Sequence, residues 1–333
     1  MGVFVAGSIG YDEVWDEFFR GPKWRAYNTD RRVTTHAVET PMENTDDVYD
    51  KWDAISYAKG AAVLRQATFL LGEDAFRDGI RLYLSRHAES NTDLEDFVGA
   101  LGEAAKTDLG DWAREWLFTP GVNTIGADFG CADGRVDRFA LRQSAPADHP
   151  VLRTQRVQVG FYDESDGVVA TTGVFPVTYS SKRTEVPAAI GRPCPTLVYP
   201  NHGDYGYAIV DLDSRTRANL TEHIGAVEDS SQRMMFWATL SDGARSGSIP
   251  IVEYLDAVLA SGGGEDDRVA IRQIYGGAVR ALRMLSGMGD PGAELLAEYG
   301  PRVENLIWNR HRRCRVREAN ALLQSLHCRG DVQ

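Results

Sequence analysis

The residue best suited to take part in a reaction is Tyr57. It lies in a stretch that would be apolar on nearly every face of a helix. That stretch runs from Asp53 to Leu71, and after Asp53 its only formal charges are Lys59 and Arg65. Because a helix without a polar face is a buried helix, we expect this one to be buried. A buried tyrosine usually packs its ring and hydrogen-bonds its hydroxyl. The alternative is a catalytic phenol, which donates a hydrogen bond to a charge that develops during a reaction.

Further helices are expected on both sides of this stretch, and they must hold Tyr57 in place. Apolar residues recur at helical spacing from Tyr11 to Phe19, and Gly21-Pro22 should end that helix. Gly72 should end the helix that carries Tyr57, and Asn91-Thr92-Asp93 is an N-cap signal for a later one. The predicted helices are 11–19, 50–71, 73–87, 94–106 and 108–118, with residues 23–49 as a loop.

The chain opens with an apolar run from Met1 to Ile9 that has no polar lead-in. This run lacks the charged leader and the cleavage site of a signal peptide, and it is too short to span a membrane. It is typical of the middle of a buried helix. We therefore interpret the N-terminus as an internal start.

The composition changes after residue 120, where short runs have β-branched or alternating character. Turn signals separate these runs, and Asp166-Gly167 between two of them predicts a hairpin. The predicted strands are 136–141, 155–162, 168–179, 196–199 and 207–212. Together they indicate a small β-sandwich.

From residue 213 onward the pattern is helical again. The candidate helices are 220–224, 234–240, 251–259, 269–285, 293–299 and 319–326. Successive helices with short connections suggest an α-solenoid, although no regular period is visible. The arginines at 310, 312, 313, 315 and 317 could form an anion-binding patch, but a solvated helix face explains them better in so acidic a chain. The fold prediction is therefore a multidomain α+β chain with domains 1–120, 121–212 and 213–333.

Bulk properties exclude some functions. The net charge of −12 argues against a nucleic-acid partner, because phosphate binding needs a basic surface. We expect no membrane association, and the acidic balance suits a cytoplasmic protein. The four cysteines, Cys131, Cys194, Cys314 and Cys328, form no C-x-x-C pair. Their spacing predicts free thiols in a reducing compartment.

Several motifs give the chain a resemblance to a known family. They are Trp24-Arg25-Ala26-Tyr27, Thr34-Thr35-His36, Ser56-Tyr57-Ala58-Lys59-Gly60, Leu71 to Gly79, Trp112 to Leu117, Thr119-Pro120-Gly121-Val122-Asn123 and Val198-Tyr199-Pro200-Asn201. In this order the chain resembles the aminopeptidase N family of zinc exopeptidases (gluzincins), in particular the actinobacterial type. The resemblance runs along most of the chain.

The resemblance implies a fold and a role for one residue. Residues 1–120 would be the helical second half of a thermolysin-like catalytic domain, followed by the β-sandwich and by the start of the α-solenoid, which is longer in the family. Tyr57 would donate its hydroxyl to the oxyanion of the zinc-bound tetrahedral intermediate. The implied substrates are peptides, from which the family removes N-terminal residues.

The zinc-binding motif of this family is absent. Such enzymes bind zinc through two His and one Glu, and the His pair comes from H-E-x-x-H on a helix. None of the histidines is followed by Glu and no two lie four apart: His36, His87, His149, His202, His223, His311 and His327. The third ligand, a Glu, would also lie upstream of Met1 to Gly7. We therefore assign no metal ligand, and we expect no zinc in this chain alone.

The remaining polar clusters have simpler explanations. Pro41-Met42-Glu43-Asn44 contains the Met-Glu-Asn of the family's substrate-anchoring motif, but on the wrong side of the family's order. Asp46-Asp47 and Glu73-Asp74 are expected to be helix-start or surface charges. His36 and His87 are expected to be structural.

Three functional hypotheses remain open. The leading one is a C-terminal portion of a cytoplasmic zinc aminopeptidase that is inactive alone. The second is a non-catalytic scaffold, derived from the family, that binds peptides or proteins. The third is a split enzyme in which a separate upstream chain supplies the zinc-bearing half.

Overall fold

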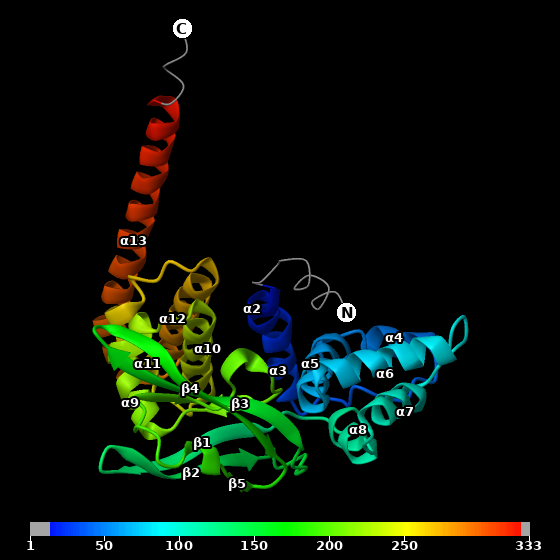
Figure 1. The fold of residues 1–333 in the computed structure, drawn as a ribbon. Helices are drawn as coiled ribbons and strands as arrows, with labels where there is room; N and C mark the ends of the chain where they lie inside the picture. Colours follow the sequence, from blue (N-terminus) through cyan, green and yellow to red (C-terminus); the bar gives the residue numbers. More distant parts are fainter. Residues whose placement is uncertain (1–13, 328–333) are drawn as a thin grey trace. The chain divides into compact units, whose positions relative to one another are not determined.

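The computed structural model describes residues 14–327, without the side chains of residue 50 and of residues 313–327 (Figure 1). These residues fall into two compact units that divide after Arg217, and each is considered by itself. The run from Met1 to Ile9 lies outside the described residues. The division into three domains at residues 120 and 212 stays a prediction.

The first unit begins with one continuous helical segment of three parts. These are α2 (Val14–Phe18), a π-helical turn η1 (Phe19–Lys23) and α3 (Trp24–Asp30). The prediction that Gly21-Pro22 ends a helix was wrong. In the π-helical turn the N–H of Trp24 reaches back to the carbonyl of Phe19, so the helix continues past Pro22, which has no N–H of its own.

The helix that carries Tyr57 also differs from its prediction. Residues 45–50 form a separate short helix, α4 (Thr45–Asp50), which begins at a capping box made by Asn44 and Asp47. A new helical segment then starts as the π-helical turn η2 (Ile55–Lys59) and continues as α5 (Gly60–Leu71). As predicted, it ends at Gly72, whose φ of 90° suits glycine.

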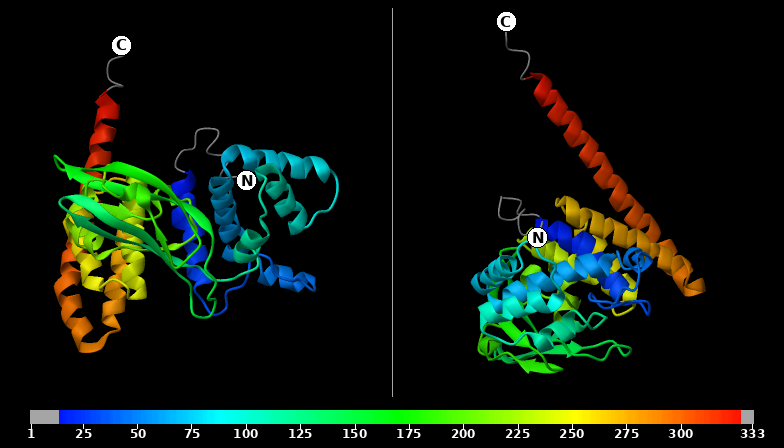
Figure 2. Two further views of the ribbon diagram at one scale, coloured as in Figure 1. Left: turned by 60° about the horizontal axis from the view of Figure 1, so that its bottom comes forward. Right: turned by 90° about the vertical axis from the view of Figure 1, so that its right-hand side faces the viewer.

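The next helices agree closely with the sequence. They are α6 (Glu73–Arg86), α7 (Leu94–Ala105) and α8 (Gly110–Trp116). Asp93 is the N-cap of α7, as predicted, and Asp96 completes a capping box. In Figures 1 and 2 the helices from α2 to α8 gather on one side of the strands. Their shared core includes Val63, Leu101, Trp112 and Trp116.

The strands of the first unit form two small sheets. One has the order β5-β2-β1-β7 and the other the order β4-β3-β6. The strands are β1 (Thr124–Ala132), β2 (Arg135–Ser144), β3 (Gln155–Ser165), β4 (Val168–Tyr179), β5 (Arg183–Glu185), β6 (Leu197–Tyr199) and β7 (Ile209–Asp211). Between β6 and β7 lies the 3-10 turn η4 (His202–Asp204).

The predicted hairpin at Asp166-Gly167 is confirmed, because β3 and β4 pair across it. Both turn residues have positive φ, 55° and 80°, as a type I′ turn requires. The two sheets share one apolar core, in which Phe161 packs 5.3 Å from Phe139 and 5.0 Å from Phe175. The first strand was missed, because Gly and Asp at alternate positions of β1 have low strand propensity.

A disulfide corrects the prediction of free thiols. Cys131, near the end of β1, is bonded to Cys194, 63 residues further along the chain. The backbone N–H of Cys194 donates to the carbonyl of Gly134 in the β1–β2 turn, which brings the two cysteines together. Sequence spacing carries no sign of this pairing, since it depends on the sheet topology.

The second unit is helical. The helix α9 (Ser214–His223) crosses the division, and α10 (Ser230–Ser246), α11 (Ile251–Ser261), α12 (Arg268–Ser286) and α13 (Gly289–His327) follow. The helices predicted at 293–299 and 319–326 both belong to α13. The break predicted between them was wrong, because the charged residues that join them form helix well but show no apolar stripe.

The disulfide should stabilise the folded state, since it closes a long loop in the unfolded chain. In the chain-entropy model its removal from a loop of 63 residues costs about 4 kcal/mol. We expect the variant Cys131→Ser/Cys194→Ser to unfold at clearly lower urea concentration than the oxidised protein. Reductant should lower the midpoint of the wild type and leave that of the variant unchanged. Equal midpoints for oxidised and reduced wild type would contradict this expectation.

Candidate active site

Tyr57 lies on the surface of the first unit. It belongs to the π-helical turn η2, in which Ile55, Ala58 and Lys59 face inward. Tyr57 itself is 59% exposed, so the interpretation of a buried tyrosine was wrong. Its ring stacks on that of Trp52, with centroids 5.8 Å apart. Among residues 14–327, no hydrogen bond engages its hydroxyl, which is therefore available to a ligand.

Asp53 fixes the start of the helical segment that carries Tyr57. Its Oδ1 accepts hydrogen bonds from the backbone N–H groups of Ile55 at 2.8 Å and Ser56 at 3.2 Å. Its Oδ2 lies 3.3 Å from Nε2 of His36, while Nδ1 of His36 lies 2.7 Å from the carbonyl oxygen of Ala37. His36 thus links the carboxylate of Asp53 to the backbone at Ala37, which agrees with the structural role expected for it.

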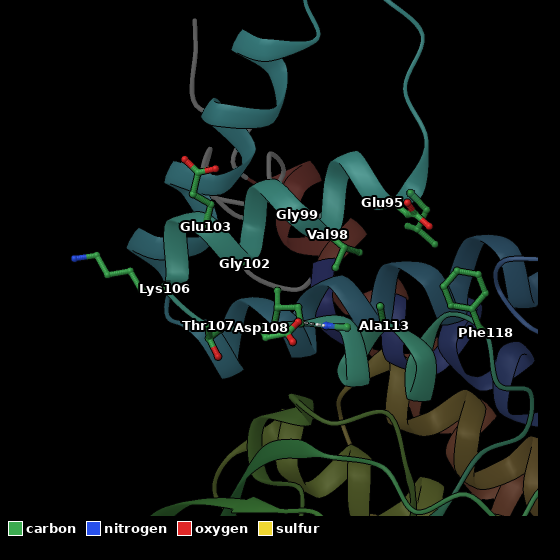
Figure 3. Close-up of a pocket in the computed structure, with 13 residues that line it drawn as sticks. Glu95, Val98, Gly99, Gly102, Glu103, Lys106, Thr107, Asp108, Ala113 and Phe118 are labelled. Atoms are coloured by element: carbon green, nitrogen blue, oxygen red, sulfur yellow. Dashed lines mark hydrogen bonds between the residues drawn. The ribbon is translucent and has the colours of Figure 1, made fainter.

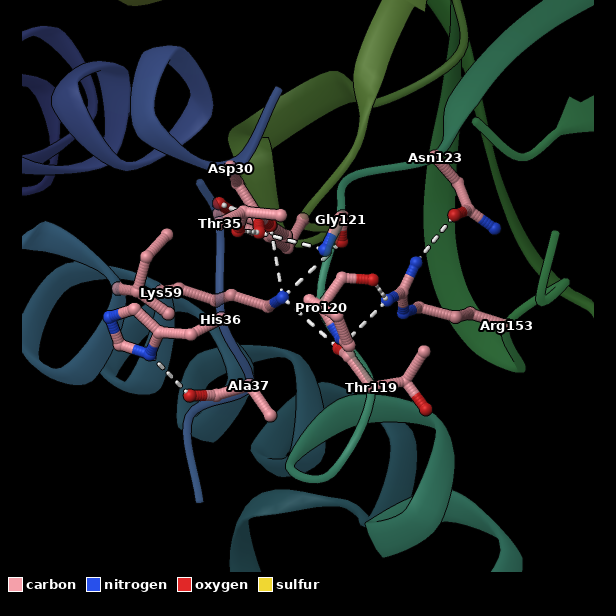
Figure 4. A network of polar contacts seen from close by, with 12 residues as sticks. Asp30, Thr35, His36, Ala37, Lys59, Thr119, Pro120, Gly121, Asn123 and Arg153 are labelled. Atoms are coloured by element: carbon pink, nitrogen blue, oxygen red, sulfur yellow. Dashed lines mark hydrogen bonds and ion pairs between the residues drawn. The ribbon is translucent and has the colours of Figure 1, made fainter. Parts of the chain in front are cut away.

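Two residues after Tyr57, Lys59 takes part in a fully buried ion pair. Nζ of Lys59 is 2.9 Å from Oδ2 of Asp30, the last residue of α3, and neither side chain has exposed surface (Figure 4). Lys59 also donates to the carbonyl oxygens of Thr119 at 3.4 Å and Gly121 at 3.3 Å. The pair therefore joins three separate segments of the chain.

The carboxylate of Asp30 makes further hydrogen bonds that satisfy its lone pairs. Oδ1 accepts from the backbone N–H of Gly121 at 2.8 Å and from the hydroxyl of Thr35 at 2.7 Å. Oδ2 accepts from the hydroxyl of Tyr207, which lies just before β7 in the chain, at 3.2 Å. Such bonds offset the cost of burying a charge.

Arg153 holds the same segment, residues 119–121, from the other side (Figure 4). Its guanidinium donates to the carbonyl oxygens of Thr119 at 3.0 Å and Pro120 at 2.9 Å, and to Oδ1 of Asn123 at 2.5 Å. The segment Thr119 to Asn123, noted in the sequence, therefore connects the helices to the first strand through two buried cations.

A second buried pair repeats this arrangement. Lys23 ends the π-helical turn η1, as Lys59 ends η2, and its Nζ lies 2.6 Å from Oδ1 of Asp204. Lys23 also donates to the carbonyl oxygen of Gly206 at 2.7 Å. Neither pair was predicted from the sequence. For Lys59 the signal was a lone lysine in an otherwise apolar stretch, whereas Lys23 stands between Arg20 and Arg25 and carries no such signal.

Burial shifts the titration of these groups. Desolvation is the largest influence on Lys23 and Lys59, and it lowers the pKa of each from 10.5 to about 8. The neighbouring aspartates act in the opposite direction and limit the shift. Desolvation also raises the pKa of Asp204.

The described residues do not fit a catalytic zinc ion. Among the side chains that the structure describes, no three of His, Cys, Asp or Glu are grouped so that they could hold a metal. In Pro41-Met42-Glu43-Asn44, the side chain of Asn44 caps α4. Asp46-Asp47 and Glu73-Asp74 lie in the first turns of α4 and α6, so the expected helix-start role is confirmed for both.

A separate pocket of about 590 Å³ lies between α7 and α8 (Figure 3). Leu94, Val98, Leu109 and Ala113 give it apolar walls, and acidic side chains stand at its rim. Glu103 of this rim is already engaged by Arg86 through two hydrogen bonds of 2.7 and 2.9 Å. The pocket does not include Tyr57, and no sequence signal pointed to it.

The buried lysines predict a dependence of stability on pH. From about pH 8 to about pH 9.5 the unfolded chain keeps them protonated, while the folded chain releases their protons. The unfolded state then binds more protons, so the free energy of unfolding should rise with pH, by up to about 1.4 kcal/mol per pH unit for each lysine. Below about pH 8 both the folded and the unfolded chain keep these protons, so the two lysines no longer make the free energy of unfolding depend on pH.

Urea unfolding across this pH range measures the slope. Lys59→Met should lose about half of it, while Lys182→Met, at an exposed position, should keep it. A slope that is flat or negative in the wild type would show that the two lysines stay protonated in the folded chain.

Two family models match the chain. The Peptidase family M1 domain matches residues 3–116, and the ERAP1-like C-terminal domain matches residues 197–326. Aminopeptidase N of Streptomyces lividans is 35% identical over 269 residues, which are 78% of this chain and 31% of that protein. Leucyl aminopeptidase of Saccharolobus solfataricus is 33% identical over 111 residues, or 33% of this chain and 14% of that protein. Endoplasmic reticulum aminopeptidase 1 of Homo sapiens is 36% identical over 107 residues, which are 32% of this chain and 11% of that protein.

The chain therefore spans less than a third of the length of each of these relatives. No helix within residues 14–327 is long and apolar enough to cross a membrane. The first family model covers Tyr57 and the Lys59–Asp30 pair, and the second covers the helical unit that follows the sheets. With these two models and the similarity to the Streptomyces protein along most of its length, the chain belongs to the aminopeptidase N family, peptidase family M1.

Proposed function

We propose that this chain supplies part of the active site of a zinc-dependent aminopeptidase that removes N-terminal residues from peptides. The observation that carries the proposal is Tyr57, an exposed phenol on a rigid support with its hydroxyl free. The three relatives named above are all aminopeptidases, and this supports the proposal. The thermolysin-like, sandwich and solenoid descriptions of the three regions belong to this proposal too.

The role proposed for Tyr57 is electrostatic. When a nucleophile attacks a peptide carbonyl, negative charge develops on the carbonyl oxygen, and a preorganised donor stabilises it by about 3 to 4 kcal/mol. The ring of Tyr57 is held by its stack on Trp52 and by the helix start that Asp53 caps. The phenol is thus oriented before the substrate arrives.

Zinc supplies, in this family, the polarisation of the carbonyl and the activation of water. The sequence has no H-E-x-x-H, and the described residues gather no metal ligands. The proposal places the metal and the general base outside the residues of this sequence, and this chain alone does not hydrolyse peptides.

A non-catalytic binding role is the alternative, and one observation favours it. Trp52 and Tyr57 are 63% and 59% exposed and their rings stack, so they form an aromatic surface suited to a peptide or protein. A cytoplasmic location also remains a proposal. The disulfide weighs against it, because such bonds are uncommon in reducing compartments.

Zinc content and release of an aminoacyl dye test the proposal. They are measured on the purified chain, and on the chain mixed with an upstream fragment that carries H-E-x-x-H. Activity only in the mixture supports a shared active site. Zinc-dependent activity of the chain alone would overturn the proposed inactivity, and no activity in either sample would favour the binding role.

Replacing the phenol tests the role of Tyr57 itself. In the active mixture, Tyr57→Phe should lower kcat by about 10² to 10³ and change KM little, because only the transition-state contact is lost. Tyr49→Phe, at an exposed tyrosine on α4, should leave both constants unchanged. If Tyr57→Phe is as active as Tyr49→Phe, the hydroxyl is not the oxyanion donor.

A further inference from the structure

A pocket of about 510 Å³ in the first unit is lined by residues that the proposed active site does not use. They come from α2, α5, the first turn of α6, β3 and the residue after η4. The aromatic and charged residues of the lining are Trp15, Arg65, Phe69, Glu73, Arg156 and Tyr205. The pocket combines aromatic faces with charges of both signs.

The aromatic wall is rigid. The rings of Phe69 and Tyr205 are stacked, with centroids 4.1 Å apart. The guanidinium of Arg65 lies between Trp15 and Tyr205, 3.9 and 5.1 Å from their centroids. Its Nη2 donates to the carbonyl oxygen of Gly203 at 2.9 Å. Arg65 is therefore occupied, and it serves as part of the wall.

Two charged side chains of the pocket, Arg156 and Glu73, make no hydrogen bond or ion pair with the described residues. Arg156 lies with its guanidinium 5.2 Å from the centroid of Phe69. Among residues 14–327, neither its guanidinium nor the carboxylate of Glu73 takes part in a hydrogen bond or an ion pair, and the two do not pair with each other. The pocket thus offers a free cation and a free anion beside an aromatic face.

We propose that this pocket binds a zwitterion with an apolar or aromatic side chain, a free amino acid or a short peptide. Arg156 takes the carboxylate, for which guanidinium is the natural bidentate partner. Glu73 takes the ammonium group, and the side chain lies against Phe69 and Tyr205. A simple anion would face the repulsion of Glu73, and a simple cation that of Arg156, so charge of both signs fits best.

This site is separate from Tyr57 and does not rest on the proposed peptidase activity. It has the usual design of a small-molecule pocket, with apolar walls and a few polar groups that orient the ligand.

Calorimetric titration of the full chain with L-phenylalanine tests the proposal. We expect saturable binding, with L-phenylalaninamide and N-acetyl-L-phenylalanine each at least about tenfold weaker, because each lacks one charge. Arg156→Gln and Glu73→Gln should each weaken L-phenylalanine by about the same factor. The matched controls are Arg142→Gln, an exposed arginine of β2, and Glu95→Gln, in the first turn of α7, and both should bind normally.

The dipeptide Phe-Phe separates the two ligand sources. Tighter binding of the amino acid supports a free amino acid as the ligand, and tighter binding of the dipeptide supports a peptide. Tyr57→Phe should bind like the wild type, which separates this site from the proposed active site. Absence of saturable binding, equal affinity for the analogues, or normal binding by Arg156→Gln would each overturn the proposal.

Discussion

The buried ion pair between Lys59 and Asp30 is the interaction on which the first unit depends. Two charges are removed completely from water, which is costly unless each is paired and hydrogen-bonded. Here the cost is offset by bonds to the backbone at Gly121 and to the hydroxyl of Tyr207. The same bonds tie the first helical segment, the Tyr57 helix and the start of the sheets together. Fold and site therefore share one constraint.

The π-helical turns explain how this constraint reaches Tyr57. In η2 the inward positions are Ile55, Ala58 and Lys59, so the lysine enters the interior while Tyr57 remains outside. The turn η1 repeats the device with Lys23 and Asp204. π-helical turns are often found at functional sites. In this chain each one sends a lysine into the protein to anchor a helix on the region of the strands.

The sequence predicted what depends on local chemistry. Asp93 as an N-cap, Gly72 as a helix end and Asp166-Gly167 as a hairpin turn were confirmed, because each acts on its immediate neighbours. The π-helical turns were missed, since periodicity assumes a regular helix. The exposure of Tyr57 was missed because a segment with few charges was expected to be buried on every side. The pairs of Lys59 with Asp30 and of Cys131 with Cys194 were missed because they join residues far apart in the chain. The role of Tyr57 came from resemblance alone.

A double-mutant cycle on the free energy of unfolding tests the central claim most directly. At pH 7, where Lys59 keeps its charge in the folded chain, Asp30→Asn and Lys59→Met should each destabilise the first unit by about 3 to 5 kcal/mol, because each leaves a buried charge unpaired. Asp30→Asn/Lys59→Met removes both charges, and it should be at least about 2 kcal/mol more stable than the sum of the single effects predicts. Single variants that each cost less than about 1 kcal/mol, with additive effects, would contradict the account and make the pair a minor contact.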